Sequence, residues 1–190
     1  MALSILPIRQ NRPQYSHVVQ LYHTDTQLIN EIGLKLKMTL ERGDSAVVIA
    51  TESHRADLSQ FLFEQGLDLA NSIVKRRYFE SDAGQTLAQF MIGDNPDAAS
   101  FAEIMGSVLV RARSAAANRS AFAFGEMVAL LWADGNKDGA IRLERLWNDL
   151  AHSHSFNLHC AYPQSAFRPQ DEDDLFEICA EHSELISSPA

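Results

Sequence analysis

Cysteine is scarce in this sequence, with only Cys160 and Cys179 among 190 residues. Two cysteines cannot form the disulfide framework that holds small secreted domains together, so that class of protein is excluded. The start of the sequence also has no apolar segment and cleavage site of the kind found in a secretion signal. We therefore expect a cytoplasmic protein.

Long apolar runs and a surplus of positive charge are also missing. No stretch approaches the roughly 20 consecutive apolar residues of a membrane-spanning helix, so we expect no membrane contact. Acidic residues outnumber basic ones by 25 to 16, which gives a net charge of -9. Nucleic-acid binding needs clustered Lys and Arg, and the densest basic cluster is only residues 75–77. We therefore expect no nucleic-acid partner.

A phosphate-binding loop is the third absence. Such a loop reads Gly-x-x-x-x-Gly-Lys-Ser/Thr directly after a strand, because its glycines let backbone N–H groups surround the phosphates. The turns after the first two predicted strands, residues 23–26 and 51–54, contain neither Gly nor Lys. ATP hydrolysis is therefore disfavoured. We expect neither enzymatic activity nor a cofactor, and keep a residual nucleotide binder as an alternative.

What the sequence does contain is a regular alternation of strand-like and helix-like segments. Strands are predicted at residues 17–22, 46–50, 73–79, 121–124 and 156–162. Helices are predicted after Thr24 or Asp25, after Ser53, and over residues 85–91, 101–112, 127–131, 141–150 and 175–179. Strands separated by helices predict an α/β fold of three layers, in which a mostly parallel sheet carries helices on both faces.

The division of the chain is predicted to be simple. Residues 1–15 contain two prolines and no apolar period, which indicates a flexible N-terminal arm. Residues 16–186 form a single domain, since no linker is long enough to split them, and residues 187–190 form a short tail.

Residues 134–139 resemble the first six positions of a calcium-binding EF-hand loop. The bidentate Glu of such a loop must occupy position 12, which here is Arg145, and Glu144 comes one residue early. One residue corresponds to about 100° of rotation on a helix, so the Glu144 carboxylate points elsewhere. A turn between two helices explains the same residues.

Four residues of the types that bind zinc lie within nine positions: His152, His154, His159 and Cys160. Neighbours on a strand point to opposite faces, so His159 and Cys160 do not share an ion. His152 and His154 lie at a predicted helix C-terminus, where the helix dipole favours cationic side chains. We therefore expect no metal site.

Glu126 follows an apolar strand and opens a helix. An acidic residue there complements the helix dipole, but the carboxyl end of a strand is also where α/β domains bind ligands, and both interpretations stay open. Trp132 and Trp147 are more typical of core anchors than of pocket walls. Cys160 on an alternating strand favours a buried apolar role, and His17 at a strand start favours a structural one.

Several short segments together resemble the MEDS family of sensory domains. They are residues 17–22 (HVVQLY), 125–128 (GEMV), 131–132 (LW), 143–150 (LERLWNDL) and 158–163 (LHCAYP), with a similar ending at residues 176–182. The resemblance covers about residues 15–186. It implies a RecA/KaiC-like core without a phosphate loop, which senses a small organic hydrocarbon derivative and signals to a histidine kinase or response regulator.

The resemblance also implies which residues bind the ligand. The leading candidates are His17, Glu126, Trp147 and Cys160, followed by Tyr22, Arg119 and Trp132. We expect one crevice near Glu126, His17 and Cys160. His23 departs from the family pattern, in which an acidic residue usually follows that tyrosine. The alternative function is a non-catalytic interaction scaffold, for which a homo-oligomer is considered because RecA-like cores often assemble.

Overall fold

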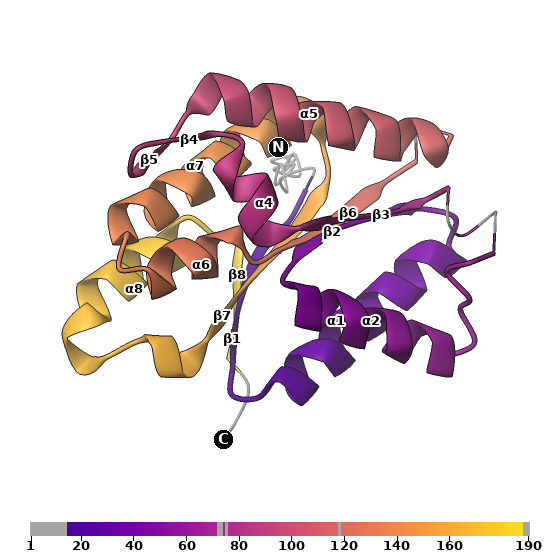
Figure 1. The fold of residues 1–190 in the computed structure, drawn as a ribbon, viewed down its shortest axis with the longest axis horizontal. Coiled ribbons are helices and arrows are strands. Elements are labelled where there is room, and N and C mark those ends of the chain that lie inside the picture. The colour runs from indigo at the N-terminus through magenta and orange to yellow at the C-terminus, as the bar shows by residue number, and fades with distance from the viewer. Residues whose placement is uncertain (1–14, 72–73, 75, 118, 188–190) are drawn as a thin grey trace, which may run out of the picture.

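The computed structural model describes residues 15–71, 74, 76–117 and 119–187. They form the predicted three-layer α/β domain, with one six-stranded sheet between two layers of helices (Figure 1). Apart from Tyr15, the predicted N-terminal arm lies outside the described residues, as do residues 188–190 of the predicted tail.

The sheet is wholly parallel, and its strand order is β3-β2-β6-β7-β1-β8. Its strands are β1 (His17–Tyr22), β2 (Ser45–Ala50), β3 (Tyr78–Asp82), β6 (Ala121–Gly125), β7 (Asn157–Pro163) and β8 (Glu184–Ser187). A separate antiparallel ribbon pairs β4 (Met91–Ile92) with β5 (Asn95–Pro96). Every residue of β1 and β2 is buried, as in parallel strands covered on both faces.

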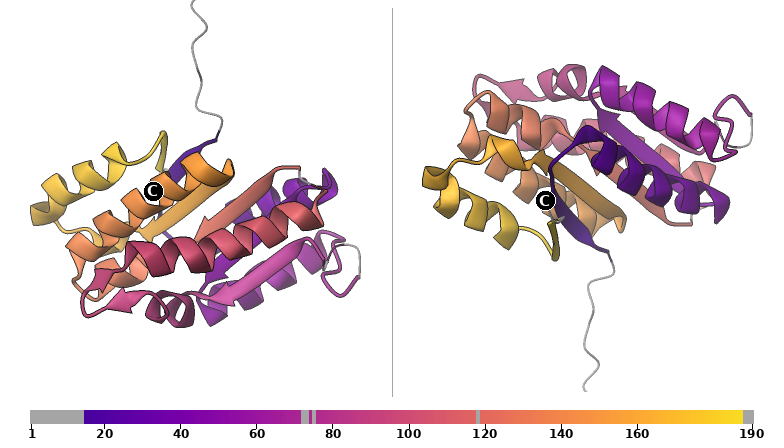
Figure 2. Two further views of the ribbon diagram at one scale, coloured as in Figure 1. Left: turned by 90° about the horizontal axis from the view of Figure 1, so that it is seen from above. Right: turned by 90° about the horizontal axis from the view of Figure 1, so that it is seen from below.

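Two helices cover one face of the sheet, and the other helices lie on the opposite face (Figures 1 and 2). The first layer is α1 (Asp25–Glu41) and α2 (Glu52–Glu64), and the second is α4 (Ala83–Ala88), α5 (Ala98–Ala115), α6 (Met127–Ala133), α7 (Lys137–His154) and α8 (Glu172–Ala180). Two 3₁₀ turns, η1 (Gln164–Ala166) and η2 (Pro169–Asp171), precede α8. Within the described ranges no helix is both long and apolar enough to span a membrane.

Close packing of α1 on α2 depends on a glycine. A Cβ atom on Gly33 would lie 2.3 Å from the ring of Phe61, so any larger residue at position 33 would push the helices apart. Local signals fix the ends of these helices. Of the two residues predicted to start α1, Thr24 is the N-cap, and it accepts from the backbone N–H of Gln27 at 3.3 Å. α2 begins earlier than the predicted start after Ser53, because Thr51 is its N-cap.

The main differences from the predicted elements lie at the sheet edges. The strand predicted over residues 73–79 begins at Tyr78, and residues 73 and 75 lie outside the description. The predicted C-terminal helix is confirmed as α8, but β8 was missed. Ser187, predicted as tail, is the last residue of β8. This edge strand has no fully buried residue, so its sequence lacks the apolar pattern of a core strand.

The larger core cluster lies beneath α5, α6 and α7 and is built around Trp147. Its ring meets Phe101 edge-on, with ring centroids 4.9 Å apart at 90°, and also contacts Phe156. The smaller cluster lies under α1 and α2. The two clusters pack against opposite faces of the sheet.

Candidate functional site

Four side chains of metal-ligand type meet in the core between the sheet and α7. They are His17 from the start of β1, Glu144 from α7, Cys160 from β7 and His182 from the turn after α8. One ligand atom from each lies within 4.8 Å of all the others. We call these four residues the buried cluster.

Strand alternation and helix phase explain why these residues meet. Cys160 lies two residues from Leu158 and from Tyr162, so it points to the same sheet face, towards α7. β1 is the parallel neighbour of β7, which brings His17 to the same face. Glu144 shares the buried stripe of α7 with Ala140 and Trp147, at spacings of four and three residues.

The Glu144 carboxylate is the centre of the buried cluster and is wholly inaccessible to solvent. Its Oε1 accepts from the hydroxyl of Tyr162 at 2.8 Å, and its Oε2 accepts from the thiol of Cys160 at 3.2 Å. Oε2 also lies 3.3 Å from His17 Nε2 and 3.4 Å from His182 Nε2. Burial alone would raise the pKa of Glu144, but the two imidazoles outweigh it and hold that pKa well below the usual range.

The two imidazoles are oriented by their other nitrogen. Nδ1 of His182 donates to the carbonyl of Ile178 at 2.6 Å. Nδ1 of His17 lies 2.9 Å from Oδ1 of Asn148, whose amide is oriented because its Nδ2 donates to the Glu181 carbonyl at 2.8 Å. Nδ1 therefore carries the proton in both rings. Despite burial, Glu144 raises the pKa of His182. In their protonated form the rings direct an Nε2–H at the carboxylate and so lower its pKa, whereas in the neutral tautomers the Nε2 lone pairs face it.

A second polar group lies at the carboxyl ends of the strands. The Glu126 carboxylate accepts from the backbone N–H of Thr51 at 2.9 Å and lies 2.5 Å from His54 Nδ1. Thr51 is the N-cap of α2, so the carboxylate occupies the positive end of that helix. Tyr22 lies beside His54, with ring centroids 6.4 Å apart. Glu126 thus ties the end of β6 to the start of α2, and its hydrogen-bonding capacity is largely used.

The Glu126–His54 pair predicts a pH dependence of stability. The hydrogen bond that His54 Nδ1 donates to Glu126 raises the pKa of His54 despite its burial. The unfolded-state pKa is about 6.5, so the pair contributes fully below that pH, and its contribution is lost as pH rises through the higher folded pKa. We expect the stability advantage of the wild type over His54→Gln to shrink with rising pH. Urea unfolding in a pH series measures it, with exposed His23→Gln as the control, and an advantage that grows with pH would contradict the assignment.

A third polar group lies on the opposite face of the sheet, under α1. Lys35 Nζ donates to His159 Nδ1 at 3.0 Å, and His159 Nε2 donates to the Gln20 side-chain oxygen at 2.9 Å. Gln20 in turn donates to Glu31 at 2.7 Å. Burial and the charge of Lys35 lower the pKa of His159 to about 3, so this imidazole is neutral.

This polar chain borders a cavity of about 270 Å³ between α1 and the strands β7, β1 and β8. Its apolar lining includes Val18, Met38, Phe122 and Leu158, and its polar lining includes Lys35, Arg42, His159 and Glu184. Apolar walls with a few convergent polar groups are typical of small-molecule sites.

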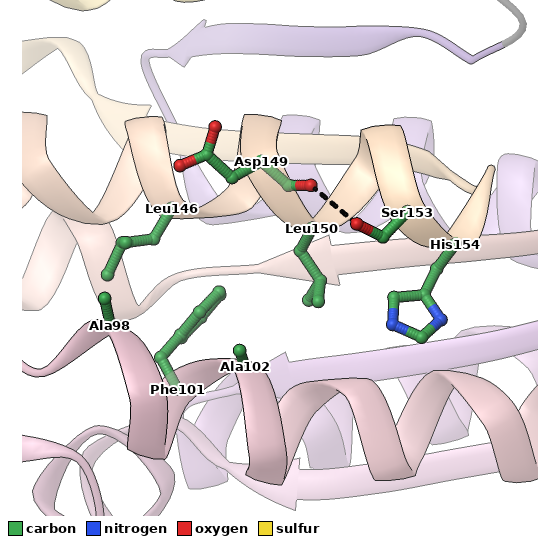
Figure 3. Close-up of a pocket in the computed structure, with 8 residues that line it drawn as sticks. All are labelled: Ala98, Phe101, Ala102, Leu146, Asp149, Leu150, Ser153 and His154. Atoms are coloured by element: carbon green, nitrogen blue, oxygen red, sulfur yellow. Dashed lines mark hydrogen bonds between the residues drawn. The ribbon is translucent and has the colours of Figure 1, made fainter.

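A different cavity, of about 300 Å³, lies between α5 and α7 (Figure 3). Phe101, Leu146 and Leu150 supply its apolar surface. In Figure 3 the Asp149 carboxylate points away from α5, and the Ser153 hydroxyl donates to the carbonyl of Asp149 on its own helix. The polar groups of this groove do not converge, so it is a weaker candidate for ligand recognition.

The seven predicted ligand-binding residues do not form one crevice. His17 and Cys160 meet in the buried cluster, whereas Glu126 and Tyr22 lie together near His54. Trp147 is 1% exposed in the core. Trp132 packs against Phe167 and donates to the Ala166 carbonyl, and Arg119 precedes β6 at the other end of the sheet, 3.5 Å from Asp44.

The four zinc-binding residue types that lie close together in the sequence, His152, His154, His159 and Cys160, do not meet at one position in the structure either. His159 and Cys160 lie on opposite faces, as strand alternation predicted. His152 Nδ1 donates to the Asn148 carbonyl at 2.7 Å and lies 2.9 Å from the Tyr15 hydroxyl, and His154 packs over Gly106.

Sequence reasoning missed Glu144, His182, Asn148, His54 and Lys35. The sequence did contain a signal for Glu144. It lies on the apolar stripe of its helix between Ala140 and Trp147, and an acidic residue buried there needs polar partners. His182 carried no comparable local signal, since its meeting with His17 joins segments far apart in the chain.

A wholly parallel sheet with helices on both faces and polar groups buried against it defines an α/β domain with polar clusters in its interior. Residues 16–182 match the family described as MEDS, the methanogen/methylotroph, DcmR sensory domain. The chain therefore belongs to the MEDS family of sensory domains, as the short segments of its sequence indicated. A comparison with curated proteins gives no match.

Proposed function

We propose that this protein is a cytoplasmic, non-enzymatic sensory module that binds a small organic molecule in the cavity beside His159 and signals through its C-terminal segment, residues 172–187. The observation that carries the proposal is the position of β8. Glu184 at its start lines the cavity, and His182, two residues earlier, belongs to the buried cluster. A ligand in the cavity would therefore touch the segment that transmits the signal.

The cavity lining supports a particular ligand chemistry. Val18, Met38 and Phe122 suit an apolar body, and Lys35 and Arg42 suit a carboxylate or another hydrogen-bond acceptor. The volume of about 270 Å³ fits a compact molecule. A small oxygenated hydrocarbon derivative meets these conditions.

The C-terminal segment is held in a way that supports a signalling role. Within α8 only Ile178 is buried, and Phe176 is 77% exposed. Its contacts with α7 are mostly polar, because Arg145 of α7 forms ion pairs with Glu177 and Glu181. A segment with few buried apolar contacts opens at low free-energy cost, so a ligand that prefers one position of it can shift its docking equilibrium. The partner that reads this change is proposed to be a histidine kinase or response regulator.

A ligand screen by thermal unfolding tests the proposal. Short carboxylates, alcohols and related compounds are added to the full chain, and a ligand at 100 times its dissociation constant stabilises by about 2.7 kcal/mol. We expect Lys35→Met to lower the affinity for a carboxylate hit at least about tenfold, since a charge-assisted hydrogen bond contributes roughly 1.5–3 kcal/mol. Lys37→Met is the matched control, because Lys37 pairs with Glu41 on the same helix.

Two results would count against the ligand site. If no compound raises the melting temperature, the small-molecule proposal fails. If a hit binds Lys35→Met and Lys37→Met equally well, the ligand lies elsewhere.

An interaction scaffold is the second candidate, and one observation favours it. β8 ends the strand order, so it is an edge strand, and Leu185 on it is 49% exposed. Edge strands can pair with another chain, including a second copy. The scaffold function is favoured if the ligand screen finds no compound and a partner protein binds wild type and Lys35→Met equally well.

A further inference from the structure

We propose that the buried cluster is a binding site for one divalent transition-metal ion, with His17 Nε2, Glu144 Oε2, Cys160 Sγ and His182 Nε2 as four tetrahedral ligands. Zn²⁺ fits this set best. The proposal does not depend on the small-molecule site, because the cavity at His159 lies on the opposite face of the sheet.

The spacing of the ligand atoms is the first argument. Metal–ligand bonds of about 2.0–2.3 Å in a tetrahedron place neighbouring ligand atoms roughly 3.3–3.7 Å apart. Glu144 Oε2 lies 3.2 Å from Cys160 Sγ, 3.3 Å from His17 Nε2 and 3.4 Å from His182 Nε2. His17 Nε2 lies 3.4 Å from Cys160 Sγ. Four of the six separations between ligand atoms are thus close to those of a tetrahedral site, and the other two are within 4.8 Å.

The orientation of the imidazoles is the second argument. Both Nδ1 atoms are occupied as donors, by Asn148 and by the Ile178 carbonyl, which leaves both Nε2 atoms to present lone pairs to the centre. This outer hydrogen bonding is the usual arrangement of metal-binding histidines. Nε2 of His182 is buried without a hydrogen-bond partner, because its approach to Glu144 at 3.4 Å lacks hydrogen-bond geometry. A buried imidazole nitrogen that faces the cluster and makes no hydrogen bond there is suited to bind a cation.

Charge balance is the third argument. With a divalent ion, one carboxylate, one thiolate and two neutral imidazoles, the charges sum to zero, which suits a site without solvent. Without the ion and with neutral imidazoles and a thiol, the carboxylate leaves one net negative charge facing two lone pairs. Binding requires the Cys160 thiol to release its proton to solvent as the metal–sulfur bond forms.

The ligand types identify the class of ion. Thiolate and imidazole favour zinc over magnesium or calcium, which take oxygen ligands. Four protein ligands without an open position indicate a structural site rather than a catalytic one. His182 is the only ligand from the C-terminal segment, so the ion would fasten that segment to β1, β7 and α7.

Cobalt substitution tests this site directly. The full chain is stripped of metal with a chelator, dialysed and titrated with Co²⁺. We expect one equivalent to bind, with thiolate-to-cobalt charge-transfer absorption and the visible bands of a tetrahedral ion, both removed when Zn²⁺ is added. Zn²⁺ alone should raise the melting temperature of the stripped protein.

Matched variants connect the signal to the named ligands. Cys160→Ser should abolish the charge-transfer band, whereas Cys179→Ser, at the other cysteine, should keep it. His182→Gln should weaken Co²⁺ binding, whereas His152→Gln should not. Asn148→Ala, which removes the acceptor for His17, should lower metal affinity about 10–100-fold.

The wild-type titration keeps the proposal falsifiable if a variant does not fold. A folded, stripped wild type that binds Co²⁺ without thiolate absorption, or that gains no thermal stability from Zn²⁺, would overturn it and leave a hydrogen-bonded His–Glu–Cys network. These outcomes are separate from the ligand screen, because Lys35→Met leaves all four proposed metal ligands in place.

Discussion

Replacing Trp147 with alanine should lower the free energy of unfolding by about 3–5 kcal/mol. The indole is 1% exposed and lies at the centre of the larger core cluster, where it meets Phe101 and Phe156 edge-on. Alanine removes these contacts and leaves a cavity that α5 and α7 cannot close without moving. Trp147→Phe keeps part of the contact area and should lose clearly less. Urea unfolding followed by circular dichroism measures both differences.

This experiment also separates the two interpretations of Trp147. The family resemblance implied a ligand-binding tryptophan, whereas the structure places its side chain in the core. Phe176→Ala is the control for loss of an aromatic ring, because that residue is 77% exposed and should change stability by less than about 0.5 kcal/mol. A Trp147→Ala protein with nearly unchanged stability but weakened ligand binding would show that the core assignment is wrong.

The central part of the fold could be predicted from the sequence because its physical signals are local. Parallel strands buried on both faces appear as short apolar runs, and residues 17–22 coincide with β1. The two helices between β6 and β7 were recognisable from their apolar stripes and from the turn between them. β8 lacks such a signal, since its pairing with β1 rather than its side chains makes it a strand.

The candidate site was less predictable because it depends on which strands are neighbours. Alternation correctly placed His159 and Cys160 on opposite faces, but it could not show that β1 lies between β7 and β8. That order brings His17 to Cys160 and His182. The same order places Gln20 next to His159, which creates the polar chain on the other face. Residue types and faces were available from the sequence, whereas strand neighbours were not.

Glu126 shows a different reason for uncertainty. Its place at a strand end allowed two interpretations. The carboxylate could complement the dipole of the helix that follows, or it could contact a ligand. The structure shows that the carboxylate serves the N-terminus of α2 rather than that of its own helix. A neighbouring helix that satisfies the same charge could not be identified from spacing along the chain, because Thr51 and Glu126 are 75 residues apart.

Glu144→Ala should be about as damaging as Trp147→Ala, although it removes a charged residue. The carboxylate is fully buried and accepts from Tyr162 and Cys160 while facing two imidazoles. Its removal leaves these groups without their common partner in a site that water does not reach. Loss of one member of a buried ionic group typically costs about 3–5 kcal/mol. The unfolding is measured with a metal chelator present, so that no bound ion contributes.

A double-mutant cycle with Tyr162→Phe distinguishes the buried network from simple loss of packing. In the wild type, Tyr162→Phe should cost roughly 1.5–3 kcal/mol, because its hydroxyl donates to a charged acceptor at 2.8 Å. In the Glu144→Ala background that acceptor is gone, so Tyr162→Phe should cost close to nothing. The coupling energy between the two substitutions then equals most of the cost of Tyr162→Phe in the wild type. Additive effects would mean that Glu144 stabilises the domain by its volume alone and that the hydrogen bond contributes nothing measurable.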